Sequence, residues 1–148
     1  MTQQAEQHTG HVPTPATAQL RMDIGEFLLA RLLEARELAE RASPGPWRPD
    51  EEHDEVLAVD GIVVAEGFAL SGRQLRATVD HIAHHHPVRV LADIDAKEEL
   101  VRAYLLVTRD PACLTDPARN LQAHVLRNVV VVLARAYDDH PDYLGSWR

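Results

Sequence analysis

The apolar residues between Asp23 and Ala42 recur every three or four positions, a spacing that predicts an amphipathic helix. Asp23 precedes the first apolar residue and Glu26 follows three positions later, which is the spacing of a capping box. The segment SPGPW at residues 43–47 ends this helix, because proline lacks a backbone N–H and clashes with the preceding turn. The residues expected on the inward face are Ile24, Phe27, Leu28, Leu32, Ala35, Leu38 and Ala39.

Two short runs rich in β-branched residues flank the dipeptide Asp60-Gly61, which is typical of a two-residue hairpin turn. We expect strands near residues 55–59 and 62–66, and therefore a β-hairpin at about 55–66. Two strands alone are only marginally stable in water, so the hairpin should pack on helices or gain a strand from a partner chain. Its exposed edge predicts self-association.

Two further helices are predicted to meet at Pro87. The first covers residues 74–85, where Leu75, Val79 and Ile82 share one face. Pro87 interrupts it, and a second apolar repeat then runs over residues 88–107. The residues expected on the inward face of this longer helix are Leu91, Ile94, Glu98, Val101 and Leu105.

A last helix should begin at Asp116-Pro117, since these residue types are typical of an N-cap and of the first helical position. It is expected to run to about Ala136. Its expected inward residues are Leu121, Val125, Val129, Val132 and Ala136. The pattern as a whole predicts an α+β fold that is predominantly α, with about four helices and one β-hairpin.

Composition divides the chain into two unequal parts. Residues 1–20 are rich in Thr, Gln and Pro and show no periodicity, so we expect a disordered N-terminal tail. Residues 21–148 are expected to form a single helical domain that carries the hairpin. Because aromatic residues make up only 5% of the 148 residues, its core should consist mainly of Leu, Val, Ile and Ala.

Charge and cysteine content restrict the classes of partner. The net charge is -8 and the arginines are scattered, so the sequence argues against unaided binding to nucleic acid. Cys113 is the single cysteine, which excludes an intrachain disulfide and fits a reducing compartment. No apolar run approaches the roughly 20 residues of a membrane span, and no apolar signal core is present. We therefore expect a cytoplasmic protein with no membrane contact.

Four of the six residues from His81 to His86 are histidine. His86 would occupy the N-cap position and Pro87 the first position of the following helix, so this stretch is interpreted as a corner whose imidazoles bond to helix ends. The alternative is a zinc or other divalent metal site, because His81 and His85 are neighbours on one helical face and His140 could join them. No third ligand is fixed by spacing, and we favour the corner without a cofactor.

Other chemistry is weakly supported. Trp47 is expected to cover the core beneath the first helix, with ligand stacking as the alternative. No serine lies in a nucleophile elbow and no glycine loop could hold phosphate, so no catalytic or cofactor-binding residue is assigned.

Four motifs occur in order along the chain: MDIxEFLxARLxE at residues 22–34, AxPGPW at 42–47, HIAxHxPxRVLxxxxAK at 81–97 and YxDHPDYxxxW at 137–147. Together they resemble a family of small proteins from Streptomyces, related actinobacteria and their phages that is classed as a domain of unknown function. The junction differs, since the family usually has His-Asp-Pro where this chain has His86 before Pro87. The candidate interaction or structural residues are Trp47, His86, Pro87, Arg89, Tyr143 and Trp147.

The resemblance implies no activity, but it favours an accessory or regulatory protein. We therefore expect a non-enzymatic interaction protein of an actinobacterium or its phage, with protein partners and a homo-oligomeric state. The alternative is a metal-dependent enzyme, or a metal or pH sensor, that uses residues His81–His86.

Overall fold

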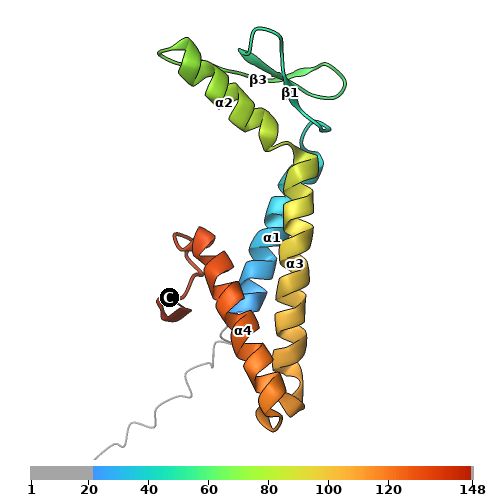
Figure 1. The fold of residues 1–148 in the computed structure, drawn as a ribbon, viewed down its shortest axis with the longest axis vertical. Helices are drawn as coiled ribbons and strands as arrows, with labels where there is room; N and C mark the ends of the chain where they lie inside the picture. The colour runs from blue at the N-terminus through green and yellow to red at the C-terminus, as the bar shows by residue number, and fades with distance from the viewer. Residues whose placement is uncertain (1–21, 148) are drawn as a thin grey trace, which may run out of the picture.

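The computed structural model describes residues 22–147 and shows an elongated helical body with a small lobe at one end (Figure 1). The body consists of α1 (Ile24–Arg41), α3 (Pro87–Arg109) and α4 (Pro117–Ala134). The lobe consists of β1 (Arg48–Pro49), β2 (Glu55–Leu57), β3 (Val63–Glu66) and α2 (Gly72–His84). The predicted α+β, predominantly helical class is confirmed.

The sheet contains one strand more than the sequence predicted. The expected hairpin is β2 and β3, which pair antiparallel, and Gly61 in its turn has a φ of 82°. The two residues of β1 pair antiparallel with the other edge of β2, so the order is β1-β2-β3. A two-residue strand that contains Pro49 carries no periodicity, which is why the pattern of the sequence did not reveal it.

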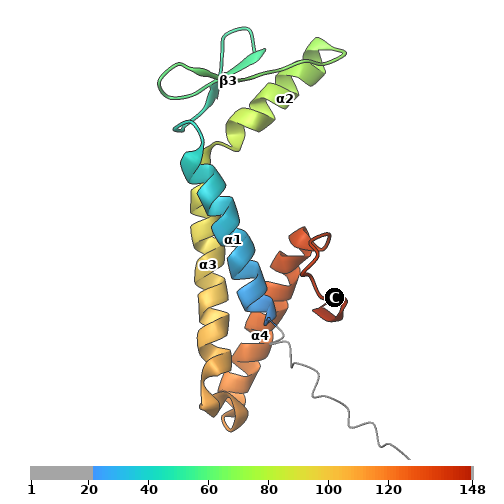
Figure 2. The same ribbon diagram turned by 180° about the vertical axis from the view of Figure 1, so that it is seen from behind.

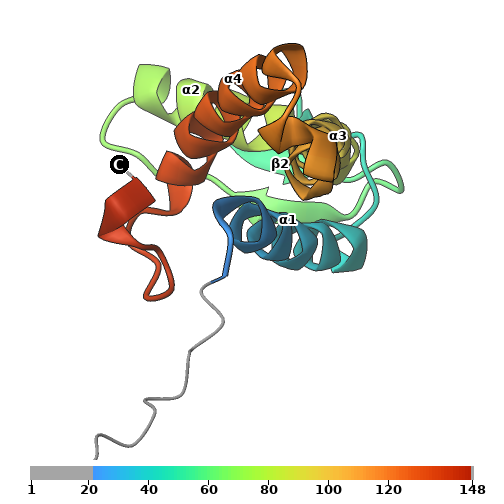
Figure 3. The same cartoon turned by 90° about the horizontal axis from the view of Figure 1, so that it is seen from below.

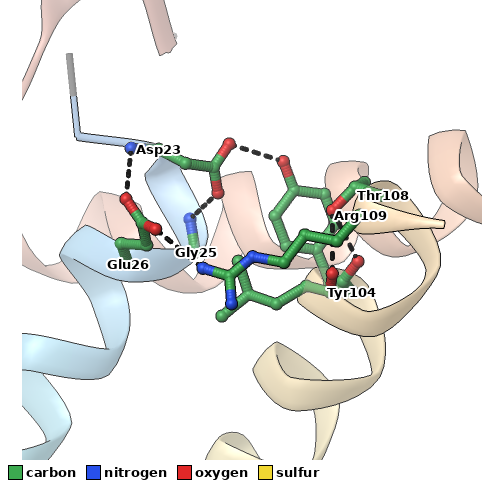
Figure 4. A network of polar contacts seen from close by, with 7 residues as sticks. Asp23, Gly25, Glu26, Tyr104, Thr108 and Arg109 are labelled. Atoms are coloured by element: carbon green, nitrogen blue, oxygen red, sulfur yellow. Dashed lines mark hydrogen bonds and ion pairs between the residues drawn. The ribbon is translucent and has the colours of Figure 1, made fainter. Parts of the chain in front are cut away.

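The α1 helix begins with the predicted capping box. Asp23 accepts a hydrogen bond from the backbone N–H of Gly25 at 2.7 Å, and its own N–H donates to Glu26 at 3.2 Å. Figure 4 shows that the same carboxylate accepts the hydroxyl of Tyr104, at 2.9 Å, and that Arg109 reaches Glu26. These contacts join the start of α1 to the end of α3.

The side chain of Tyr104 is buried at this contact between α1 and α3. Burial, reinforced by the hydrogen bond to Asp23, raises the pKa of Tyr104 to about 12. A Cβ atom on Gly25 would lie 2.7 Å from the Tyr104 ring, so the helix start accepts the ring only because residue 25 has no side chain.

The largest core lies in the body, where α1 and α3 pack side by side along their length (Figure 2). It is made mostly of aliphatic residues, as the low aromatic content predicted. Its buried residues are Ile24, Phe27, Leu28, Leu32, Ile94, Val101, Tyr104, Leu105, Val130, Val131, Ala134 and Trp147. Leu38, which was expected to face inward, is instead exposed because the end of α1 extends past α4 toward the lobe.

The prediction of the inward face of α4 is wrong. Ala123, Val130, Val131 and Ala134 are buried, and they lie on the opposite side of the helix from the expected residues. The expected residues Leu121, Val125, Val129, Val132 and Ala136 are exposed. Both faces of this segment are apolar, so periodicity alone could not distinguish the packed face from the open one.

The C-terminal segment folds back onto the first turns of α1 (Figure 3). The ring of Phe27 lies 5.7 Å from that of Tyr143 and 5.2 Å from that of Trp147, measured between ring centroids. Tyr143 and Trp147 therefore complete the core of the body. Among residues 22–147, none of the helices combines the length and the apolarity that a membrane span requires.

The lobe has a much smaller core, formed by Val56, Val79 and Ala83. Its β1–β2 connection is organised by Asp50, whose carboxylate accepts the backbone N–H groups of Glu55 at 2.9 Å and Asp54 at 3.0 Å. Those bonds, that of Glu55 first, lower the pKa of Asp50 to about 2. The expected disordered tail at residues 1–20 lies outside the described residues.

Candidate functional site

The histidine-rich stretch forms the corner between α2 and α3. His86 is the N-cap of α3 and its Nδ1 accepts the backbone N–H of Arg89 at 3.3 Å, while Pro87 occupies the first helical position. At the end of α2, Nδ1 of His85 lies 2.9 Å from the carbonyl oxygen of His81 and donates to it. The imidazoles thus satisfy backbone groups that helix ends leave unpaired.

An open pocket of about 300 Å³ lies beside this corner, between β1, α2 and the first turn of α3. It combines cationic side chains with an apolar wall. The residues that line it are Trp47, Arg48, Pro49, Asp80, Ala83, His84, His86 and Arg89. The pocket therefore brings together three residues that the sequence had singled out, namely Trp47, His86 and Arg89.

The sequence suggested that Trp47 covers the core beneath the first helix, and this prediction is wrong. Trp47 packs against the core of the lobe, and its indole N–H donates to the carbonyl oxygen of Ser43 at 2.9 Å. The preceding SPGPW turn runs against the corner, since a Cβ atom on Gly45 would lie 3.1 Å from Nδ1 of His86. The turn that ends α1 thereby places the indole at the wall of the pocket.

The arginines of the pocket differ from several of those in the body. Arg36, Arg102 and Arg109 each form an ion pair with a glutamate across or along the helices. Within residues 22–147, the side chains of Arg48 and Arg89 have no ion pair. Asp80 is the one carboxylate that lines the pocket with them, and it is not within ion-pair distance of either guanidinium group.

The other titratable groups of the pocket are Asp80, His84 and His86. The carboxylate of Asp80 lies 3.7 Å from Nε2 of His53, and this imidazole is its only close ionic partner among the described residues. The positive charge of Arg89, followed by slight desolvation and the neighbouring histidines, lowers the pKa of His84 below its usual value. The imidazole of His84 thus stays neutral to lower pH than a free histidine.

The three candidate metal ligands are not brought together. The rings of His81 and His85 are neighbours, 4.4 Å apart. The ring of His140 instead packs 5.6 Å from Phe27, and its Nδ1 lies 3.3 Å from Arg31, near the start of α1. The corner adjoins the other end of α1, roughly 20 Å away at 1.5 Å per helical residue. Within residues 22–147, no group of three or more His, Cys, Asp or Glu side chains is arranged to hold a metal ion.

Sequence reasoning missed Arg48, and it singled out His84 within the histidine-rich stretch without assigning it or Asp80 to a pocket. Asp80 and His84 are one helical turn apart on α2, so a search for polar residues that share a face with Ala83 could have found them. Arg48 lies on the short strand β1, and no sequence signal places that strand beside α2. Its position depends on tertiary contacts between β1 and α2.

A family model described as a family of unknown function (DUF6221) matches residues 21–148. This match covers the stretch on which the four sequence motifs lie, and it agrees with the predicted resemblance to a family of unknown function. The actinobacterial or phage origin stays a prediction. Searches of curated proteins and of solved structures gave no match.

Proposed function

The chain belongs to this family of unknown function (DUF6221), and we propose that it is a non-enzymatic interaction protein that docks a protein partner on the outer face of α4. One observation carries the proposal: a stripe of apolar residues on α4 is open to solvent. The exposed fractions are 65% for Leu121, 54% for Val125, 36% for Val129 and 60% for Val132. We call these four residues the α4 stripe.

The α4 stripe supports a docking role because the opposite face of the same helix is also apolar. The inner face packs on the body through Ala123, Val130, Val131 and Ala134. A helix that is apolar on all sides is normally buried on all sides, and contiguous exposed apolar patches mark interaction sites on soluble proteins. The body covers only one side of α4, and a partner would cover the other.

The charges on α4 support one kind of partner. The helix contains no Asp or Glu, although the chain as a whole carries a net charge of -8. His124 and Arg135 are exposed on or just after it, and Arg135 has no ion pair within residues 22–147. The surface that fits is an amphipathic helix with apolar residues at three- and four-residue spacing and acidic residues beside them.

A site-specific crosslink tests which surface occupies the stripe. A photoreactive amino acid at Gln122, beside the stripe, would be irradiated in native lysate and the crosslinked peptide sequenced by mass spectrometry. We expect an acidic, amphipathic segment of another protein. A crosslink to the same chain would show that a second copy occupies the stripe, and would overturn the proposal of a different partner.

A matched pair of variants tests the contribution of the stripe to affinity. Val132 on α4 and Val59 near the hairpin turn are equally exposed, at 60%. Against the recombinant partner, we expect Val132→Glu to weaken binding at least tenfold and Val59→Glu to change it less than twofold. The reverse result would assign binding to the hairpin, where the free edge of β3 had suggested self-association.

An accessory or regulatory role in the cytoplasm of an actinobacterium or its phage extends this proposal. It is supported by the sequence resemblance and by the acidic, single-cysteine composition. Light scattering would measure the oligomeric state directly. A monomer would contradict the expected homo-oligomer, but it would be consistent with a different protein as the partner of the α4 stripe.

A further inference from the structure

Two arginine side chains line the pocket beside the α2–α3 corner. Arg48 approaches from β1 and Arg89 from the first turn of α3, and neither side chain has an ion pair within residues 22–147. A guanidinium group presents two parallel N–H donors that match the oxygens of a phosphate. Two such groups that line one pocket offer an oxyanion several hydrogen-bond donors.

The imidazoles add neutral donors to the same volume. Nδ1 of His86 accepts the N–H of Arg89, so in the neutral ring the proton resides on Nε2, which is then a hydrogen-bond donor. His84 lines the pocket from α2, and the positive charge of Arg89 favours its neutral form. An anion between these groups would offset the mutual repulsion of the positive charges.

The remaining walls restrict what the anion is attached to. Trp47 and Pro49 supply apolar surface, and the volume of about 300 Å³ lies at the lower end of the range for small-molecule sites. Asp80 is the one acidic residue of the lining. Its carboxylate would repel the phosphate as well as any second anionic group, so the two guanidinium groups must outweigh it, and it can accept a hydrogen bond from a hydroxyl group.

We propose that this pocket binds the phosphate group of a small hydroxylated molecule, a phosphate monoester, between Arg48 and Arg89. The site is separate from the α4 stripe and does not depend on the proposed partner. His84 and His86 donate to the phosphate or to its ester oxygen, and Asp80 accepts from a hydroxyl group of the ligand.

Titration of the full chain with glycerol 3-phosphate, inorganic phosphate and glycerol tests the proposal. Binding would be followed at pH 7.5 through backbone amide chemical shifts. We expect the shifts to concentrate at residues 47–49 and 80–90, with glycerol 3-phosphate bound at least threefold more tightly than inorganic phosphate and glycerol not bound. The absence of saturable shifts at millimolar glycerol 3-phosphate, or shifts spread over all exposed arginines, would overturn it.

Two variants that lose the same charge distinguish the pocket from the general field of the protein. Arg89→Gln removes a pocket guanidinium, whereas Arg73→Gln removes an exposed guanidinium at the start of α2 that does not line the pocket. We expect Arg89→Gln to weaken binding at least tenfold and Arg73→Gln less than twofold. Equal losses would show that binding depends on net charge alone, and would exclude this pocket as the site.

His86→Asp separates binding from folding. Aspartate is a better N-cap than histidine, so this variant should melt at a higher temperature than the unaltered chain. The added carboxylate would repel the phosphate, and we expect the variant to lose binding at least tenfold. A variant that is more stable and binds with unchanged affinity would overturn the proposal. Because the variant is more stable, a loss of binding could not be explained by a loss of structure.

Discussion

The body and the lobe are held together in different ways. The body buries twelve residues in one core, whereas the lobe buries Val56, Val79 and Ala83. Several charged groups of the body are paired across its helices: Arg36 with Glu98 and Arg109 with Glu26. In the pocket of the lobe and the adjoining start of α3, Arg48 and Arg89 have no ion pair within the described chain.

The two regions of the chain therefore differ in what their polar side chains do. The body uses its side chains to maintain the fold, and the lobe keeps several cations and imidazoles available at one pocket. A small core also opens more readily than a large one, since local stability follows the number of buried apolar contacts. The following predictions test this difference, beginning with the largest expected effect.

Phe27→Ala should destabilise the whole body. The side chain is fully buried and its ring contacts those of Tyr143 and Trp147. We expect the free energy of unfolding to fall by about 4 kcal/mol, the usual range for removal of a buried phenylalanine. Chemical denaturation followed by circular dichroism would measure it. A loss below about 1 kcal/mol would show that the C-terminal segment does not complete the core.

Glu98→Ala should lower the free energy of unfolding by about 2 kcal/mol. Glu98 is buried and accepts hydrogen bonds from Arg36 at 3.1 Å and from Arg102 at 2.8 Å, so its removal leaves the partly buried Arg36 without this partner. Asp95→Ala removes an exposed partner of the same Arg36 and provides the control, with an expected loss below about 0.5 kcal/mol. Equal losses for the two variants would contradict a special role for the buried carboxylate.

Val79→Ala should loosen the lobe alone. Val79 is fully buried in the small core of the lobe, and removal of its methyl groups should cost about 1.5 kcal/mol locally. Hydrogen exchange measured by mass spectrometry should accelerate over β2, β3 and α2 and stay unchanged over α1 and α3. Equal acceleration in the body would show that the two regions unfold as one unit.

His86→Asp should stabilise the protein by about 1 kcal/mol. The carboxylate would cap α3 more strongly than imidazole and would place a negative charge at the positive end of the helix. A thermal melt would show a higher midpoint. A lower midpoint would indicate that His86 has a stabilising partner outside residues 22–147.

The smallest expected effect concerns pH. The pKa of His84 is lowered in the folded chain by Arg89 and the neighbouring histidines. The unfolded chain therefore binds a proton first, and stability should decrease as the pH falls below about 6.5 toward the folded pKa. Thermal melts between pH 7.5 and 5.5, compared with those of His84→Gln, would isolate this contribution. Identical pH dependence in both proteins would contradict it.

Much of the secondary structure could be predicted locally. The α1 helix begins at its capping box, and α4 begins at Asp116 and Pro117, because the signals for helix starts lie within four residues of each other. The hairpin itself was also predicted, but its connection is residues 58–62 and not a two-residue turn, since Gly61 has a positive φ and Asp60 does not. Of the residues expected to face inward on α3, Ile94, Glu98, Val101 and Leu105 are buried, whereas Leu91 is half-buried.

The candidate site was less predictable. The sequence identified the corner at His86 and Pro87, but it suggested a metal trio that includes His140. The structure places His140 against Phe27, because the C-terminal segment packs on the start of α1 and the corner adjoins the end of α1. The path of the returning segment depends on contacts between residues more than one hundred positions apart, and no local pattern contains that information.

The sequence by itself determined the number and type of the main elements, the capped helix ends and the corner, because these depend on neighbouring residues. Only the tertiary structure decided which apolar face of α4 is buried, that Arg48 and Arg89 line one pocket with Trp47, and that Tyr143 and Trp147 complete the body. Both faces of α4 carry apolar residues, so the pattern along the sequence does not indicate which one is buried. The choice between them is made by the packing of α4 against α1 and α3, which is a property of the assembled chain.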